Sequence, residues 1–350
     1  MTNISRERDL IAIIKGHDAL SGLNNVAQTI ADELVAQLNR WHSLPEQWDN
    51  ALDTQIHRWY AAAKPIWPKR PYYSPSSANS CPRELYVKAK RAKRDSFPKP
   101  PYQGRWQSIG TAIGDVIQRD ILAMERNLPD CPFSFERNED GTPVFEDFAK
   151  TNHRVDFDGQ TFYLYGTCDG ILRYVNAEGE VIRVGLEIKS KQTSAARTSL
   201  HSMREPEDKH VKQCVAYSAM YDVDYYVILY VNAAKKGWNM TEEDFAKTPD
   251  IRAFGIEIDD IDRHELFDRL ARVNRCVENN DPPPLDIESW LFNNFKTACA
   301  ESLSAEEIDD LRLQVEQVKR SRLPDWKKRP YLEALEFIEK VREGTAANGD

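Results

Sequence analysis

Two carboxylates and one lysine between residues 166 and 189 have the types and spacing of a metal-assisted hydrolytic site. Asp169 lies in a Gly-Thr-Cys-Asp-Gly turn, and Glu187 and Lys189 follow it in the segment Leu-Glu-Ile-Lys. Carboxylate oxygens are the hard ligands that Mg²⁺ or Mn²⁺ prefers, and such a cation lowers the pKa of bound water and neutralises charge on a phosphate. A lysine beside the cation could hold the attacking water. These residues therefore suit hydrolysis of a phosphodiester.

The predicted strands bring these side chains to one face. Residues two apart in a strand point to the same side, so Glu187 and Lys189 emerge together while Ile188 points into the core. If segments 169–174 and 181–188 are neighbouring strands of a hairpin, Asp169 reaches the same face. A Glu-x-Lys triplet on an exposed strand is more often a surface ion pair. Here the residues before Glu187 are apolar, so the charges mark the end of the strand.

The next predicted helix, 208–221, adds polar side chains near this site. Gln213 and Tyr217 are four residues apart and therefore lie on one helical face. His210 precedes Gln213 by about one turn, although a core or surface role is the commoner one for a single histidine. Positive charge also follows the lysine-bearing strand, at Lys191 and Arg197.

In this order, the motifs Gly166-x-x-Asp169, Glu187-x-Lys189 and Gln213-x-x-x-Tyr217 resemble the PD-(D/E)XK nuclease superfamily. The resemblance is greatest to the branch of RecB-type nuclease domains and Cas4-like exonucleases, which includes phage-encoded members. Segments 77–86 and 110–118 also resemble upstream segments of that branch. The likeness covers roughly residues 77–231, under half of the chain. Each motif is weak alone, and the ordered set is more specific.

The resemblance implies a Mg²⁺- or Mn²⁺-dependent deoxyribonuclease, most simply an exonuclease in DNA recombination, replication or repair. By similarity, Asp169, Glu187 and the Ile188 carbonyl would bind the cation. Lys189 would handle the attacking water, and Gln213 and Tyr217 would line the site and touch DNA. The implied partners are DNA and a single-strand annealing or other recombination protein. The implied location is the cytoplasm, which is the cytoplasm of the bacterial host if the protein is phage-encoded.

Two alternatives use the same residues differently. One is a non-catalytic DNA-binding or assembly protein on a degenerate nuclease fold. The other is a structure-specific endonuclease. Gly114 favours the first, because many family members carry a metal-binding histidine at this place. Asp115, Gln118 or Glu125 could substitute for it, or the site could hold its cation with fewer protein ligands.

The cysteines do not support the iron–sulfur cluster of Cas4-like relatives. Cys81 lies where the first cluster ligand would be, but only Cys276 and Cys299 follow the core. Four thiolates are needed for such a cluster, so we expect none and expect Cys81 to be a buried, small apolar residue. The six cysteines form no CxxC pair, which indicates free thiols in a reducing compartment.

Charge and hydropathy limit the classes of function. The formal net charge of −9 argues against a protein that wraps DNA through bulk charge. It does not exclude an enzyme whose basic residues line one groove. No apolar stretch approaches the roughly 18 residues of a membrane span, and the N-terminus lacks the pattern of a signal peptide. We therefore expect no membrane association.

One basic run could supply such a groove. Segment 83–99 contains seven basic and two acidic residues, and a solvated helix face explains it equally well. Aromatic residues in and after this run could stack on unpaired bases: Tyr86, Tyr102 and Trp106. The candidate DNA-binding cations are Lys90, Arg91, Lys93, Arg94, Lys191 and Arg197.

The elements that must position these residues form a mixed α/β pattern. We expect helices at 6–63, from 81–83 onward, at 109–126 and at 208–221. Strands are expected at 161–165, 169–174, 181–188 and 225–231, and proline-rich breaks at 64–80 and 97–104. After residue 232 we expect mostly helical structure, including a capping box at 304–307. This pattern fits an α/β fold with a mixed central sheet of the PD-(D/E)XK type, flanked by helices and extended by helical additions at both ends. The expected regions are a helical region with linker (1–75), a nuclease core (76–235), a mostly helical region (236–342) and a disordered tail (343–350).

Overall fold

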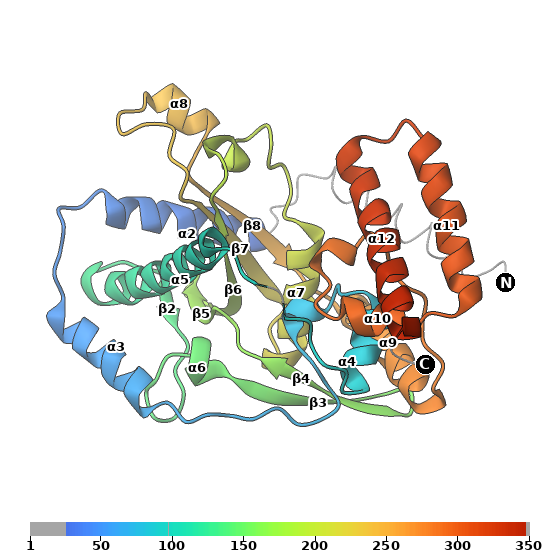
Figure 1. Ribbon diagram of the computed structural model, residues 1–350. Coiled ribbons are helices and arrows are strands. Elements are labelled where there is room, and N and C mark those ends of the chain that lie inside the picture. Colours follow the sequence, from blue (N-terminus) through green and yellow to red (C-terminus); the bar gives the residue numbers. More distant parts are fainter. Residues whose placement is uncertain (1–25, 97, 348–350) are drawn as a thin grey trace.

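The computed structural model describes residues 26–96 and 98–347 and contains two β-sheets, one in the centre of the molecule and a smaller one along the lower edge of the view (Figure 1). The central sheet has the order β2-β5-β6-β7-β8, and a smaller sheet has the order β1-β4-β3. The strands are β1 (Tyr72–Tyr73), β2 (Phe133–Phe135), β3 (Thr151–Phe157), β4 (Gln160–Gly166), β5 (Gly170–Val175), β6 (Val181–Lys191), β7 (Tyr225–Asn232) and β8 (Ile251–Glu257). Only β6 and β7 are parallel in the central sheet, and the other neighbours are antiparallel. The predicted mixed α/β fold is confirmed.

Helices cover both faces of the central sheet. They are α2 (Val26–His42), α3 (Asn50–Ala62), α4 (Pro82–Ala89), α5 (Pro101–Asn127), α6 (Glu146–Ala149), α7 (Asp208–Tyr221), α8 (Glu242–Lys247), α9 (Asp260–Asn279), α10 (Lys296–Glu301), α11 (Ala305–Arg320) and α12 (Asp325–Ala347), with short 3₁₀ helices η1 (Pro75–Ser77), η2 (Ala195–Thr198) and η3 (Trp290–Phe292). On one face, α2 and α5 bury a core that includes Leu34, Ile121 and Leu186. On the other face, α7 and α9 bury a second core that includes Cys214 and Ile228.

The crossover from β6 to β7 positions the candidate residues. Parallel neighbours need a long connection, and here it contains η2 and α7. The N-terminal end of α7 therefore lies near the carboxyl end of β6. Strand parity follows the prediction, because Ile188 packs in the α5 core. Glu187 lies opposite Ile228 in the ladder, on the face covered by α7.

The N-terminal helical region differs from the predicted single stretch. Residues 26–62 form two helices separated by residues 43–49, which contain Pro45, and residues 6–25 lie outside the described part of the chain. Asp49 starts the second helix by accepting a hydrogen bond from the Leu52 N–H at 2.9 Å. A proline and a side-chain cap thus end one helix and begin the next.

The two proline-rich breaks are also more ordered than expected. Segment 64–80 contains β1, which pairs in parallel with β4. At the second break, α5 already begins at Pro101, since a proline at the first helical position loses no intrahelical hydrogen bond. The helix opened by Pro82 is present as predicted, but it ends at Ala89. The following cations therefore lie in a loop.

The central sheet draws on residues outside 76–235. Strand β8 pairs with β7 although we expected mostly helix after residue 232. Helix α2 crosses β8 so closely that a Cβ atom at Gly255 would lie 1.8 Å from the Ala27 carbonyl oxygen. The Gly255 N–H also donates to the Gln28 side chain at 3.0 Å. Glycine is therefore required at this crossing, a tertiary contact that local periodicity does not encode.

The C-terminal helices also differ in part from the prediction. The predicted capping box is present at the start of α11, where the Ser304 and Glu307 side chains and backbones bond reciprocally. Helix α12 runs on to Ala347, so residues 343–347 are helical rather than disordered, and 348–350 lie outside the described residues. Packing of Ala334 and Ile338 in the core holds α12. Within the described ranges, no helix combines the length and apolarity that crossing a membrane requires.

Candidate active site

Asp169 is fixed at the start of β5 by two hydrogen bonds, one to its side chain and one to its main chain. Its Oδ2 accepts from the Ile188 N–H at 2.6 Å. This bond extends the β5–β6 pairing beyond the Gly170–Leu186 pair at the end of the ladder. The Gln118 side chain of α5 donates to the Asp169 carbonyl oxygen at 2.8 Å. The Asp169 carboxylate is therefore tied to the end of β6, and its main chain is tied to α5.

Glu187 is buried beside Asp169. Its side chain is 1 % exposed and forms an ion pair with Lys189. Its Oε2 is buried and has no hydrogen-bond partner among the described residues. Burial and, to a smaller extent, the charge of Asp169 raise the pKa of Glu187 to about 8 against the opposing effect of Lys189. Burial likewise raises the pKa of Asp169, although the Ile188 N–H lowers it. A pair of carboxyls in this state favours a proton or a cation.

Lys189 connects the carboxylates to α7. Its Nζ donates to the Gln213 Oε1 at 3.2 Å, and the Gln213 Nε2 lies 3.4 Å from the Tyr217 hydroxyl. Burial lowers the pKa of Lys189, but the charges of Glu187 and Asp169 outweigh it, so the net pKa is raised and the ammonium is kept. The structure thus brings together the five residues that the sequence placed in the site: Asp169, Glu187, Lys189, Gln213 and Tyr217.

Glu146, which sequence analysis did not select, is a third carboxylate near this pair. Its N–H donates to the Cys168 carbonyl at 3.0 Å, and its own carbonyl accepts from the Thr167 hydroxyl. Burial raises the pKa of Glu146 to about 7, and the charge of Asp169 adds to the shift. It starts α6 with a φ of +45°, a conformation that β-carbon-bearing residues rarely adopt. No motif in the sequence signals this placement.

The carboxylates do not form a three-ligand cage. Across residues 26–96 and 98–347, no group of three or more His, Cys, Asp or Glu side chains is arranged to hold a metal ion. A cation would therefore depend on Asp169, Glu187, main-chain oxygen and water. Mg²⁺ is commonly held in this way, with one or two carboxylates and several waters.

Helix α5 brings one of the three candidate substitutes for the missing histidine to the site. A Cβ atom at Gly114 would meet no other atom within 4 Å, so this position faces open space. Asp115 is exposed, and Glu125 is paired with Arg137 at 2.7 Å. Of the three candidates, only Gln118 contacts the site, through the main chain of Asp169.

The predicted DNA-binding cations lie in different environments. Four of them form an exposed loop after α4, here called the basic loop: Lys90, Arg91, Lys93 and Arg94. Arg197 is exposed on η2. Lys191, by contrast, is only 15 % exposed, is paired with Glu207, and lies over the Tyr230 ring. Its charge is therefore largely compensated by contacts within the protein.

Burial decides the roles of three further residues. Tyr86 is buried in α4 and cannot stack on a base, because its side chain is part of the core. Cys81 is fully buried, and its sulfur accepts a hydrogen bond from the Asp286 N–H at 3.1 Å. His210 is also buried, with its Nδ1 2.8 Å from the Tyr230 hydroxyl. Burial lowers the pKa of His210 to about 3, and the charge of Lys189 adds to the shift.

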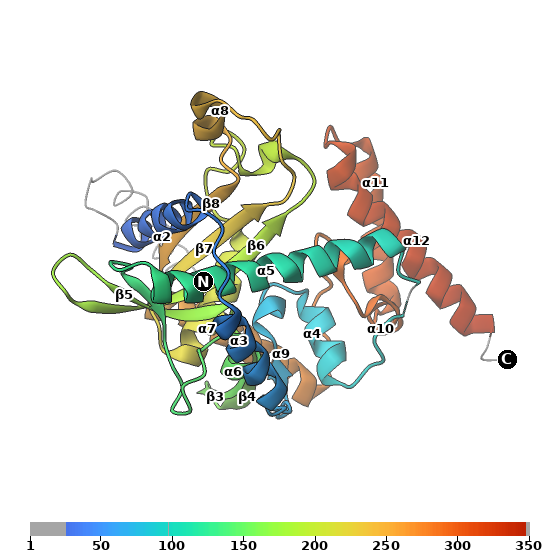
Figure 2. The ribbon, with the colours of Figure 1, turned by 90° about the vertical axis from the view of Figure 1, so that its left-hand side faces the viewer.

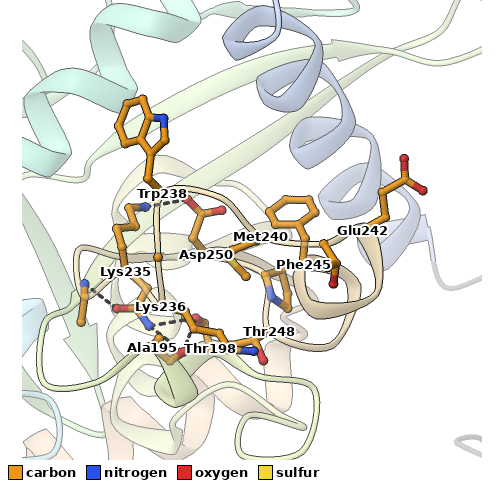
Figure 3. A pocket seen from close by; sticks show the side chains of 15 residues that line it. Ala195, Thr198, Lys235, Lys236, Trp238, Met240, Glu242, Phe245, Thr248 and Asp250 are labelled. Atoms are coloured by element: carbon orange, nitrogen blue, oxygen red, sulfur yellow. Dashed lines mark hydrogen bonds and ion pairs between the residues drawn. The ribbon is translucent and has the colours of Figure 1, made fainter.

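A separate cavity of about 480 Å³ lies between η2 and the connection from β7 to β8 (Figure 3). Lys235 and Asp250, which line it, are 2.6 Å apart, and Lys236 and Asp244 are 2.5 Å apart. Both lysines that line it are therefore paired with carboxylates. None of the five residues of the candidate site lines it.

Comparison with known proteins gives only distant likenesses. No family model matches the chain, and no curated protein matches it. Among solved structures, the protein SSO0001 has 13 % identity and a TM-score of 0.37, over 72 % of this chain and 95 % of its own. An alkaline exonuclease from Laribacter hongkongensis has 12 % identity and a TM-score of 0.35, over 64 % and 95 %. A phage-related exonuclease from Haemophilus somnus 129PT has 14 % identity and a TM-score of 0.29, over 59 % and 81 %. Likeness at this level carries no conclusion about activity.

Proposed function

We propose that the protein is a Mg²⁺- or Mn²⁺-dependent deoxyribonuclease of the PD-(D/E)XK type that acts as an exonuclease in DNA recombination, replication or repair. One observation carries the proposal. The Glu187 Oε2 is buried and unpartnered among the described residues, next to Asp169 and Lys189. A buried carboxylate oxygen without a partner costs folding free energy, and a cation held by both carboxylates would offset that cost.

The donor set fits such a cation. Asp169 uses Oδ2 for the Ile188 N–H, which leaves Oδ1 as the ligand oxygen. In a strand, the N–H and C=O of one residue face the same neighbouring strand. The Ile188 carbonyl therefore faces the side on which Asp169 lies, and can act as a third oxygen donor. When bound, the cation supplies a Lewis acid that activates water and neutralises charge on the phosphate.

The protein side chains would then position the reacting groups. Lys189 is held between Glu187 and Gln213, and its side chain is 24 % exposed, so Nζ can reach a bound phosphate or water. A charge fixed in this way before the reaction stabilises the transition state without reorganisation. Tyr217, through its contact with Gln213, keeps the α7 side of the site in place. The basic loop and Arg197 would contact the phosphate backbone of DNA.

The deciding experiment uses end-labelled linear DNA and covalently closed circular DNA, each with Mg²⁺, Mn²⁺ or EDTA. We expect degradation of linear DNA only, and only with a cation. Cutting of both substrates would identify an endonuclease. DNA binding without any cutting would identify a non-catalytic DNA-binding protein and refute the proposal. Glu187→Gln should abolish cleavage, while Asp156→Asn, which changes an exposed carboxylate on β3, should not.

A further inference from the structure

The N-terminal half of α5 carries an exposed apolar stripe. Tyr102, Trp106, Ile109 and Val116 are 49 %, 50 %, 44 % and 53 % exposed. Their spacing of four, three and seven residues places them on one helical face. The Tyr102 and Trp106 rings contact each other edge to face, with centroids 5.6 Å apart. Figure 2 shows this half of α5 extending past the strands of the central sheet. An exposed apolar stripe of this kind marks an interaction surface.

The aromatic end of the stripe is joined to the candidate active site. The Gln192 Nε2 donates to the Trp106 carbonyl at 3.0 Å and to the Ser190 Oγ at 3.1 Å. A Cβ atom at Gly110 would lie 3.2 Å from the same Ser190 Oγ, so α5 packs directly against the residue after Lys189. The buried Oε1 of Gln192 has no hydrogen-bond partner within the described part of the chain. The stripe therefore begins beside Ser190, which follows Lys189 at the carboxyl end of β6.

The charge around the stripe selects a polyanion. Segment 88–116, which ends with the last residue of the stripe, contains seven Lys or Arg residues and two Asp, in a chain with a net charge of −9. One of these cations, Arg105, directly precedes Trp106 and borders the stripe on the helix. The segment is thus opposite in charge to the molecule as a whole. This charge complements the phosphates of a nucleic acid.

We infer that Tyr102 and Trp106 form a stacking platform for unpaired bases of a DNA strand that enters the active site. The inference rests on the proposed nuclease function and specifies its substrate. In a duplex the base faces are covered by neighbouring pairs, whereas an unpaired base can place its face on an aromatic ring. Exposed aromatic rings combined with positive charge are the general means of binding single strands without sequence preference. The enzyme therefore takes single-stranded or frayed ends in preference to blunt duplex ends.

The test measures binding in EDTA, so that no cleavage occurs. Wild type, Tyr102→Ala, Trp106→Ala and the double variant are titrated with fluorescein-labelled oligothymidylate and with a blunt duplex. Each substitution should weaken single-strand binding by about tenfold, since one base–aromatic stack contributes on the order of 1–3 kcal/mol. Duplex affinity should change less than twofold. Trp48→Ala is the matched control, because Trp48 is 76 % exposed in the loop between α2 and α3.

Several results would overturn the inference. Wild type that does not bind the oligothymidylate, or a double variant that binds it normally, would exclude the platform. A change of oligomeric state in the double variant, seen by sedimentation without a change in DNA binding, would assign the stripe to a second copy of the chain. Hydrolysis of bis(4-nitrophenyl) phosphate, a phosphodiester without bases, separates the two proposals. If wild type with Mn²⁺ does not hydrolyse this compound, that result would count against the nuclease function. The binding measurements in EDTA test the stacking platform independently of cleavage.

Discussion

Replacing Glu187 with glutamine should stabilise the folded protein while abolishing cleavage. Glutamine has nearly the same shape as glutamate, so the packing around this 1 % exposed side chain is kept. The substitution removes a carboxyl whose pKa burial raises to about 8. It also removes a ligand oxygen of the proposed cation site. Stability and activity should therefore change in opposite directions, which is unusual for a buried polar residue with only a structural role.

The pKa shift sets the size and the pH range of the effect. Because the folded-state pKa lies above the ordinary value of 4.5, the stability contribution of the protonated carboxyl is complete below about pH 4.5. It is lost as the pH rises through about 8, when the folded protein must ionise a buried group. A shift from 4.5 to about 8 corresponds to a loss of roughly 3–5 kcal/mol in the free energy of unfolding at alkaline pH. The glutamine variant should not show this loss.

The assay is urea unfolding of wild type and Glu187→Gln at pH 5, 7 and 9, in EDTA and with Mg²⁺. We expect similar stabilities at pH 5 and a more stable variant at pH 9 in EDTA. Mg²⁺ should restore the stability of the wild type, because a ligand that binds only the folded state stabilises it, and should affect the variant less. Asp156→Asn should show no such alkaline gain. A Glu187→Gln protein that is less stable than wild type at pH 9 would refute the reasoning, since it would mean that the ion pair with Lys189 outweighs the cost of burying the charge.

Three further predictions concern the chemistry, the DNA contacts and the cysteines. Lys189→Ala should bind Mn²⁺ at least as tightly as wild type in calorimetry, because a neighbouring positive charge is removed. Its single-turnover cleavage rate should nevertheless fall by about two orders of magnitude, which corresponds to roughly 3 kcal/mol. Near-normal cleavage would mean that Glu187 and Lys189 form only a structural ion pair. Replacing all four cations of the basic loop with alanine should reduce the slope of log DNA affinity against log salt concentration. The reduction should be about 0.7–0.9 for each phosphate that the variant no longer neutralises. An unchanged slope would show that the loop is exposed to solvent and does not contact the phosphates. Purified protein should lack the broad absorbance near about 400 nm of an iron–sulfur cluster, and brown protein that loses its colour in Cys81→Ser would contradict this.

Strand parity and helix periodicity could be predicted from the sequence. The two-residue period of a strand placed Ile188 in the core and Glu187 on the opposite face, as the structure has them. The bounds predicted for the helix at 208–221 agree with α7, so Gln213 and Tyr217 lie on one face at the end of β6. These features depend on contacts within a few residues, which set local periods of 2 and 3.6.

Other features arise only from packing between distant segments. The crossing of α2 over β8 at Gly255 joins residues 227 positions apart, and the pairing of β8 with β7 adds an edge strand beyond the predicted core. The burial of Tyr86, which removes it from any DNA surface, depends on the hydrophobic core that α9 and the C-terminal helices complete. Local patterns carry no information about such partners.

The electrostatic state of the site is likewise a property of the tertiary structure. The sequence identified Asp169 and Glu187 as carboxylates on one face, but not that Glu187 is buried with an unpartnered oxygen. Nor did it indicate Glu146, whose left-handed backbone conformation directs it toward residues 167–169. Burial and the distances between charges decide a pKa, and both are fixed by elements that lie far apart in the chain. The residue types could therefore be read from the sequence, whereas their ionisation required the fold.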